Sequence, residues 1–171
     1  MILNCDDHRL DVYKRQAYQL ACGFLEEDVA ADANRVLEMY LCGYEEGKNP
    51  NSYTFYFNYR FNDLPFLMDA QRMRDWKMKA PVEIYVEGSK VRRYKRYVVK
   101  KEMTPYHMME LQESYIEAMD LFFENYPDLT GQNLTEFTPV YQQSGGEIEL
   151  TWMAEVHNAQ YYGWSSQEAG G

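Results

Sequence analysis

A segment in which every second side chain is aromatic limits the possible folds of this chain more than any other feature. The alternation runs through residues 53–61, with aromatic rings at Tyr53, Phe55, Phe57, Tyr59 and Phe61. Successive side chains of a strand point to opposite faces, so these rings would form one continuous aromatic face. We expect this strand to form part of the core, with helices covering its aromatic face. A platform on which nucleic-acid bases stack is the alternative interpretation.

The periodicity of apolar residues predicts three helical regions. Residues 17–46 show helical spacing, with a break near Gly23 that could divide them into two helices. A helix is also expected from Thr104 to about Tyr126, because Thr is a good N-cap and Pro105 suits the first helical position. Another helix is expected after Pro65, and its buried stripe would consist of Phe66, Leu67, Ala70, Met73 and Trp76.

Alternating apolar residues on either side of glycine-containing turns predict two hairpins. Strands at 82–87 and 91–99 flank Gly88-Ser89, and a second pair is expected at 137–142 and 147–156. The strand at 91–99 is rich in Lys and Arg, which predicts a place at a sheet edge. These elements favour an α+β fold, with a mostly antiparallel sheet of about five strands packed by three or four helices.

The chain is expected to hold a single domain over residues 17–164. Residues 11–16, DVYKRQ, resemble the translated sequencing-adapter read-through found at the ends of some metagenomic reading frames. Residues 1–16 are therefore interpreted as a non-native segment. The small and polar residues 165–171 are interpreted as a flexible tail.

The net charge of −10 is distributed very unevenly along the chain. Residues 102–171 contain twelve Asp and Glu and no Lys or Arg. Residues 60–101 contain twelve Lys and Arg against five Asp and Glu. This polarity indicates a protein that acts through a charged surface.

Five carboxylates of the helix expected over 104–126 share one face. At about 100° per residue they fall within an arc of about 80°, and we call this set the acidic ridge: Glu110, Glu113, Glu117, Asp120 and Glu124. Like charges three or four residues apart repel by a few tenths of a kcal/mol each, and no Lys or Arg follows Lys101 to offset them. We expect the ridge to bind a basic partner by imitating nucleic-acid phosphates, and its candidate extension is Glu147, Glu149, Glu155, Tyr161, Tyr162 and Trp164. A solvated face of an acidic protein is the alternative.

The basic strand offers a second candidate surface. Its cations and aromatic rings alternate, as in sites that contact phosphates and stack on bases, at Lys90, Arg92, Arg93, Tyr94, Lys95, Arg96 and Tyr97. One alternative is an edge strand that its charges protect from aggregation. Another is a homo-oligomer in which this strand meets the acidic ridge of a second copy.

The sequence does not contain the motifs of common catalytic or cofactor sites. G-x-S-x-G, P-loop, dinucleotide-binding and H-E-x-x-H patterns are all missing. His107 with Glu110, and His157 with the acids of its strand face, are weak candidates for metal binding. We therefore expect no enzymatic activity, no cofactor and no metal.

The cysteines and the hydropathy bear on the compartment. Cys5, Cys22 and Cys42 lie too far apart for a zinc motif, and their odd number gives no disulfide framework. Reduced thiols predict a cytoplasmic protein. No apolar run reaches the length of about eighteen residues that a membrane-spanning helix needs, so no contact with a membrane is expected.

The sequence favours a non-enzymatic interaction protein. The sharpest hypothesis is an acidic nucleic-acid mimic that inhibits a DNA- or RNA-binding enzyme, of the type carried by phages and mobile elements. The alternatives are a nucleic-acid-binding module that uses residues 90–101, and a homo-oligomeric structural protein.

Overall fold

The computed structural model describes residues 12–30, 38–99, 111–144, 147–157, 159–162 and 164–168. Its helices are α1 (Val12–Ala30), α2 (Ala70–Asp75), α3 (Tyr115–Asn125) and the 3-10 turn η2 (Gly131–Asn133). Its strands are β1 (Glu38–Glu46), β2 (Ser52–Phe61), β3 (Leu64–Leu67), β4 (Val82–Glu87), β5 (Lys90–Arg96), β6 (Glu136–Ser144), β7 (Glu147–Val156), β8 (Ala159–Tyr162) and β9 (Ser165–Glu168). None of the described helices is long and apolar enough to cross a membrane.

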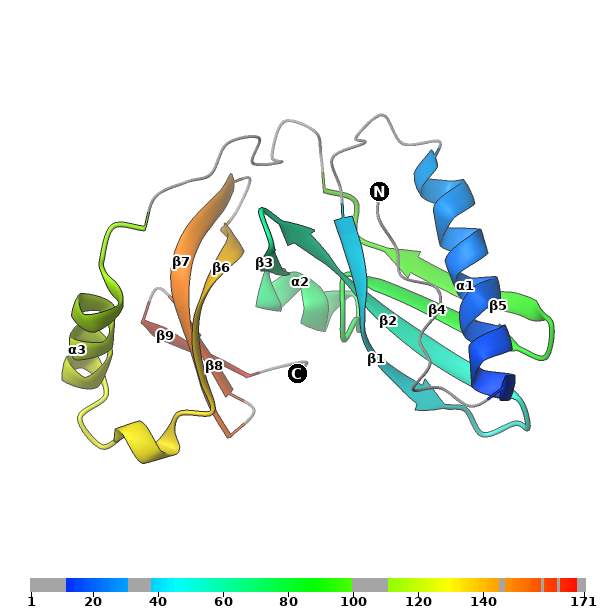
Figure 1. The fold of residues 1–171 in the computed structure, drawn as a ribbon. Coiled ribbons are helices and arrows are strands. Elements are labelled where there is room, and N and C mark those ends of the chain that lie inside the picture. The colour runs from blue at the N-terminus through cyan, green and yellow to red at the C-terminus, as the bar shows by residue number, and fades with distance from the viewer. Residues whose placement is uncertain are drawn as a thin grey trace.

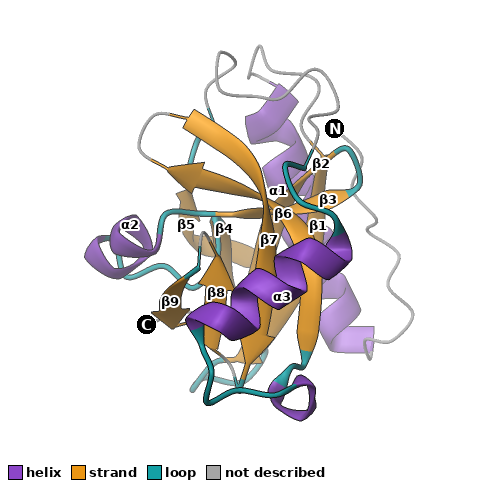
Figure 2. Cartoon of the chain, turned by 90° about the vertical axis from the view of Figure 1, so that its left-hand side faces the viewer, coloured by secondary structure: helices purple, strands orange, loops and turns teal. Residues whose placement is uncertain are grey.

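The strands form one mixed sheet, which confirms the α+β class (Figure 1). The strand order is β5-β4-β2-β3-β6-β7-β8-β9, and β1 pairs with β2 outside this path. β3 and β6 run parallel, and the other described pairs are antiparallel. The nine described strands exceed the predicted number of about five. Helix α1 covers one part of the sheet, and α3 covers the part formed by β6–β8 (Figure 2).

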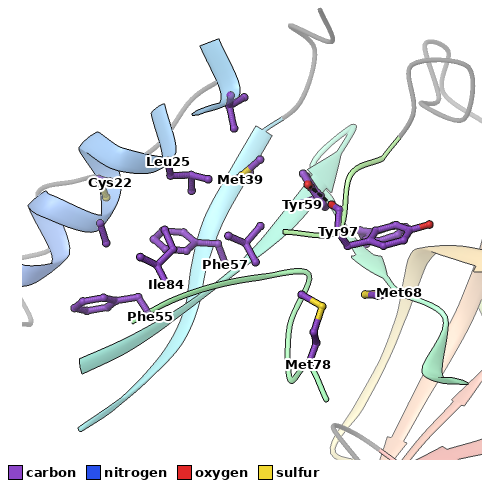
Figure 3. Close-up of a cluster of buried hydrophobic side chains, with 14 of the residues drawn as sticks. Cys22, Leu25, Met39, Phe55, Phe57, Tyr59, Met68, Met78, Ile84 and Tyr97 are labelled. Carbon is purple, nitrogen blue, oxygen red and sulfur yellow. Dashed lines mark hydrogen bonds between the residues drawn. The ribbon is translucent and has the colours of Figure 1, made fainter. Parts of the chain in front are cut away.

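The aromatic face of β2 is the centre of the larger core. Its five rings are all buried, and Tyr18 of α1 packs on Phe55 and Phe57 with ring centroids 5.5 and 6.1 Å apart. Cys22 and Leu25 of α1 are buried in the same cluster (Figure 3). The expectation of a core strand is therefore confirmed, and the rings are not available for stacking on nucleic-acid bases.

Two segments predicted as helix are strands. Residues 38–46 form β1, in which Met39 pairs with Tyr59 and Leu41 pairs with Phe57. Apolar side chains at 37, 39 and 41 fit a strand as well as a helix. Residues 38–46 form a strand because they hydrogen-bond to an edge of β2 that would otherwise be unpaired. Residues 64–67 form β3, because Asn62 and Asp63 both have positive φ and make a two-residue hairpin turn. Only the short α2 follows, and Trp76 is exposed rather than part of a buried stripe.

Both predicted hairpins are present. Gly88, with φ of +61°, forms the turn between β4 and β5, and β5 lies at the edge of the sheet as expected. β6 and β7 pair along their whole length. The short strands β8 and β9 extend this second hairpin and were not predicted from sequence.

Helix α3 is shorter than the predicted helix over 104–126. Residues 111–114 are not helical, and residues 100–110 lie outside the described part of the chain. The helix begins after Ser114, which forms a capping box with Glu117. Phe122 is completely buried between α3 and the sheet, in a smaller cluster with Ala154 and Val156.

The proposed non-native segment overlaps α1. Residues 12–16 are the first residues of this helix, and Lys14 Nζ lies 2.9 Å from a carboxylate oxygen of Glu46 on β1. The first eleven residues, with Cys5, lie outside the described part of the chain. Whether residues 1–16 are native stays a prediction.

Candidate functional site

Three of the five acidic-ridge residues lie together on α3. Glu117, Asp120 and Glu124 are exposed and follow one another along the helix, and we call them the α3 acidic face. Glu113 precedes the helix and is half-buried, and its carbonyl oxygen accepts a hydrogen bond of 3.0 Å from the Trp152 indole. Glu110 lies outside the described residues. The structure therefore brings three predicted ridge carboxylates together rather than five.

The capping box and the core contacts fix the position of the α3 acidic face. The Glu117 backbone N–H donates to the Ser114 hydroxyl at 3.3 Å, and the Ser114 N–H donates to the Glu117 carboxylate at 3.1 Å. A carboxylate in the first turn also interacts favourably with the helix dipole. On the opposite side, Phe122 packs in the small cluster with Tyr126. The face is thus held on a helix that is anchored at its start and in its middle.

Exposed aliphatic side chains flank the carboxylates. Ile116 is 70% exposed and Leu121 is 37% exposed. On a helix, Ile116 is four residues before Asp120, and Leu121 is four residues after Glu117, so each lies beside an acid. This pairing of aliphatic and acidic residues is visible in the sequence itself.

The predicted extension of the ridge does not adjoin α3. Ala154 and Val156 of β7 pack beneath the helix, and side chains alternate along a strand. Glu147, Glu149 and Glu155 therefore lie on the opposite face of the sheet. Glu155 accepts a hydrogen bond of 3.2 Å from the hydroxyl of Thr135.

The three aromatic residues of the predicted extension are structural side chains. Tyr161 and Trp164 pack on Phe122, with ring centroids 5.7 and 5.2 Å away. Tyr162 is buried on the other side of the sheet. None of the three is a free anchor for a partner.

Part of the basic strand faces inward. The Tyr94 hydroxyl donates to Asp28 of α1 at 2.6 Å, and Arg96 Nε lies 3.4 Å from the same carboxylate oxygen. Desolvation, followed by this hydrogen bond, raises the pKa of Tyr94. Tyr97 is buried, and its hydroxyl accepts hydrogen bonds from Arg72 and Gln143. These side chains serve the fold, so they are not free to bind nucleic acid.

Three of the other four cations of the basic strand stand opposite residues of β4. Lys90 pairs with Glu87 and Lys95 pairs with Glu83 across the hairpin, and such cross-strand pairs are mildly stabilising. The Arg93 guanidinium lies 5.2 Å from the ring centroid of Tyr85. The positive charge of this strand is thus partly offset within its own hairpin.

Among the described residues, no ion pair compensates the carboxylates of α3. The sequence has no Lys or Arg after Lys101, and the ion pairs found among the described residues involve only residues of α1, β1, β5 and Lys79. In the described ranges, no three His, Cys, Asp or Glu side chains gather as metal ligands would.

A cavity that the sequence did not suggest lies between the two parts of the sheet. It has a volume of about 300 Å³ and is lined by residues of β1, β2, β3, α2, β6, β7 and β8. Tyr40 and Cys42 of β1 form part of its wall. The helix predicted over 38–46 would have placed these two side chains on different faces. Alternation within 38–46 was the only sequence pattern that could have placed both side chains on one strand face.

Comparison with known proteins adds no functional information. We found no protein-family model, no curated protein and no solved structure that matches this chain.

Proposed function

We propose that this protein is a non-enzymatic interaction protein that binds a basic partner protein through the exposed face of α3. The observation that carries the proposal is that three exposed carboxylates and two exposed aliphatic side chains share this face, in a part of the chain without a single Lys or Arg. Contact surfaces combine apolar area with charges that complement the partner. A merely solvated face would need the acids but not Ile116 and Leu121.

The fixed backbone of α3 favours a role of its acids in binding over a role in solubility alone. The Ser114 cap and the buried Phe122 hold the carboxylates on a fixed backbone, so little backbone freedom is lost when a partner docks. The rise of about 1.5 Å per residue separates successive acids by about 5 and 6 Å along the axis. Charges at this spacing can occupy a groove that binds phosphates, which lie about 3.4 Å apart along the axis of one DNA strand.

The finer proposal is therefore that the α3 acidic face acts as a nucleic-acid mimic and inhibits the enzyme whose groove it occupies. The competing possibility is self-association, in which the α3 acidic face of one copy meets the basic strand of another. Both predict attraction to cations, but only mimicry predicts competition with nucleic acid.

The direct test uses an oligoarginine peptide as the probe. Its affinity for the wild-type protein is compared with that for the triple variant Glu117→Gln, Asp120→Asn, Glu124→Gln by fluorescence anisotropy at low salt. A matched control neutralises three exposed acids elsewhere, in the variant Glu27→Gln, Asp63→Asn, Glu147→Gln. Both variants change the net charge equally, so any difference between them reports the location of the charge.

We expect the α3 triple variant to bind at least about threefold more weakly than the control, since exposed ion pairs contribute about 0.2–1 kcal/mol each. Equal losses in the two variants would contradict a localised binding surface. Sedimentation of the wild-type protein at low and high salt tests self-association. If duplex DNA displaces this protein from a basic partner, mimicry is supported. If the partner binds DNA and this protein at the same time, mimicry is contradicted.

A further inference from the structure

The cavity beside β1 is suited to a small ligand, because several strands and one helix contribute to its wall. Its wall comes from β1 and β2 on one side, β3 and α2 in the middle, and β6, β7 and β8 on the other. Its volume of about 300 Å³ is at the lower end of the range for ligand pockets. A site of this size suits a small molecule, such as a single ring with one substituent.

One wall of the cavity carries a hydroxyl that the protein leaves ready to donate. Asn58 Nδ2 donates to the Tyr40 hydroxyl oxygen at 3.1 Å and to the Phe66 carbonyl at 2.8 Å, which fixes the Asn58 amide. Its carbonyl oxygen accepts from the Tyr59 N–H at 2.8 Å. The Tyr40 hydroxyl oxygen accepts this bond, and among the described residues no group accepts the Tyr40 hydroxyl proton. Desolvation is the main cause that raises the pKa of Tyr40, so the phenol keeps its proton at neutral pH.

Much of the rest of the wall is apolar and rich in methionine. Met68, Met73 and Met153 line it together with Phe66 and Tyr162. Thioethers make favourable contacts with aromatic rings and adapt their shape to a ligand. This lining favours a flat ring over an aliphatic one.

The charges around the cavity do not favour an anion. Lys79 lines it, but its ammonium lies 2.7 Å from the Glu45 carboxylate. Glu136 also lines the cavity and is exposed. A ligand carboxylate would meet a cation that is already paired and a like charge.

From this geometry we infer that the cavity binds a small neutral aromatic molecule whose hydrogen-bond acceptor meets the hydroxyl of Tyr40. The ring lies among Met68, Met73 and Met153. This site is separate from the α3 acidic face, so either can fail without the other.

The test titrates three probes into the wild-type protein and follows backbone amide shifts by NMR. Benzamide has a ring and a neutral acceptor, benzoate has the same ring with a negative charge, and cyclohexanecarboxamide has the acceptor without the aromatic ring. We expect benzamide to shift the amides of residues that line the cavity, and to bind at least threefold more tightly than each of the other two. No shift with benzamide, or equal binding of all three, overturns the inference without the need for a variant.

Two variants then locate the contacts. Tyr40→Phe removes only the hydroxyl, and Tyr44→Phe is the matched control, since Tyr44 is an exposed tyrosine of the same strand outside the cavity. We expect Tyr40→Phe to weaken benzamide binding about three- to tenfold, the range for one lost neutral hydrogen bond, and Tyr44→Phe to leave it unchanged. Gln160→Phe places a ring into the space and is expected to abolish binding. Benzamide binding that survives both Tyr40→Phe and Gln160→Phe overturns the assignment.

Discussion

The carboxylate of Asp28 on α1 lies 3.4 Å from the Arg96 guanidinium on β5 and joins the N-terminal helix to the edge strand of the sheet. The Arg96 side chain is only 10% exposed, whereas that of Asp28 is 41% exposed. The same carboxylate oxygen accepts the Tyr94 hydroxyl. One acid thus contacts two side chains of the edge strand.

Replacing this acid should destabilise the protein through the charge left behind. We expect Asp28→Asn to lower the free energy of unfolding by about 1–3 kcal/mol, because the largely buried charge of Arg96 then loses the carboxylate of Asp28. Urea unfolding followed by circular dichroism measures the change. Glu27→Gln, an exposed acid on the same helix, serves as the control, and an equal effect of the two variants would contradict a specific role for Asp28.

We expect the Tyr94 hydroxyl to make the free energy of unfolding decrease at high pH. Desolvation and the hydrogen bond to Asp28 raise the pKa of Tyr94 above its usual value of 10.0 in the folded protein. The stabilisation is therefore complete below pH 10, and it decreases above pH 10 because only the unfolded chain then loses the proton. We expect the unfolding free energy to fall less steeply between about pH 9 and about pH 11 in Tyr94→Phe than in the wild-type protein. Parallel curves for the two proteins would count against this prediction.

The N-cap of α3 should control the local stability of the proposed binding surface. Ser114→Ala removes the hydroxyl that accepts from Glu117, and the loss of such a cap costs about 1 kcal/mol. Amide hydrogen exchange in α3 should speed up about fivefold. Ser89→Ala, at the exposed turn between β4 and β5, should leave α3 exchange unchanged. Identical protection of α3 in both variants would show that the cap does not hold the helix.

Cys42 is an exposed cysteine that we expect to react slowly. Its side chain packs against β2, where the thiol donates to the Tyr56 carbonyl, and the local desolvation raises its pKa from 9.0 to about 11. Since the thiolate is the nucleophile, and its greater basicity offsets only part of its lower population, alkylation below pH 9 should be about tenfold slower than in the urea-unfolded chain. Peptide mapping after iodoacetamide treatment measures this ratio. A ratio near one would show that Cys42 is an ordinary free thiol.

The basic strand should bind duplex DNA only weakly. Glu83 and Glu87 stand opposite Lys95 and Lys90, and the whole chain carries a net charge of −10. We expect elution from immobilised duplex DNA at low salt, with no difference between the wild-type protein and Arg92→Gln, Arg93→Gln. Retention at low salt that is lost as the salt concentration rises, and that this double variant lacks, would instead favour the nucleic-acid-binding alternative.

The features that the sequence could predict are those that depend on neighbouring residues. The aromatic side chains at 53, 55, 57, 59 and 61 fall on one face because alternation is a property of any strand, and a face of five large rings favours a place in a core. Gly88 marks a hairpin turn through its own conformational freedom. The absence of Lys and Arg after Lys101 is visible without any structure.

The features that only the tertiary structure decided are those that depend on a distant partner. Residues 38–46 could be helix or strand, and pairing with β2 made them β1. Tyr94 and Tyr97 look like nucleic-acid contacts in the sequence, but Asp28 and Gln143 turn them inward. Glu149 is negatively charged like the α3 acidic face, but the alternation of side chains along β7 places it on the opposite face of the sheet. The cavity near Tyr40 depends on strands far apart in the chain, because it exists only where β3 joins the two halves of the sheet.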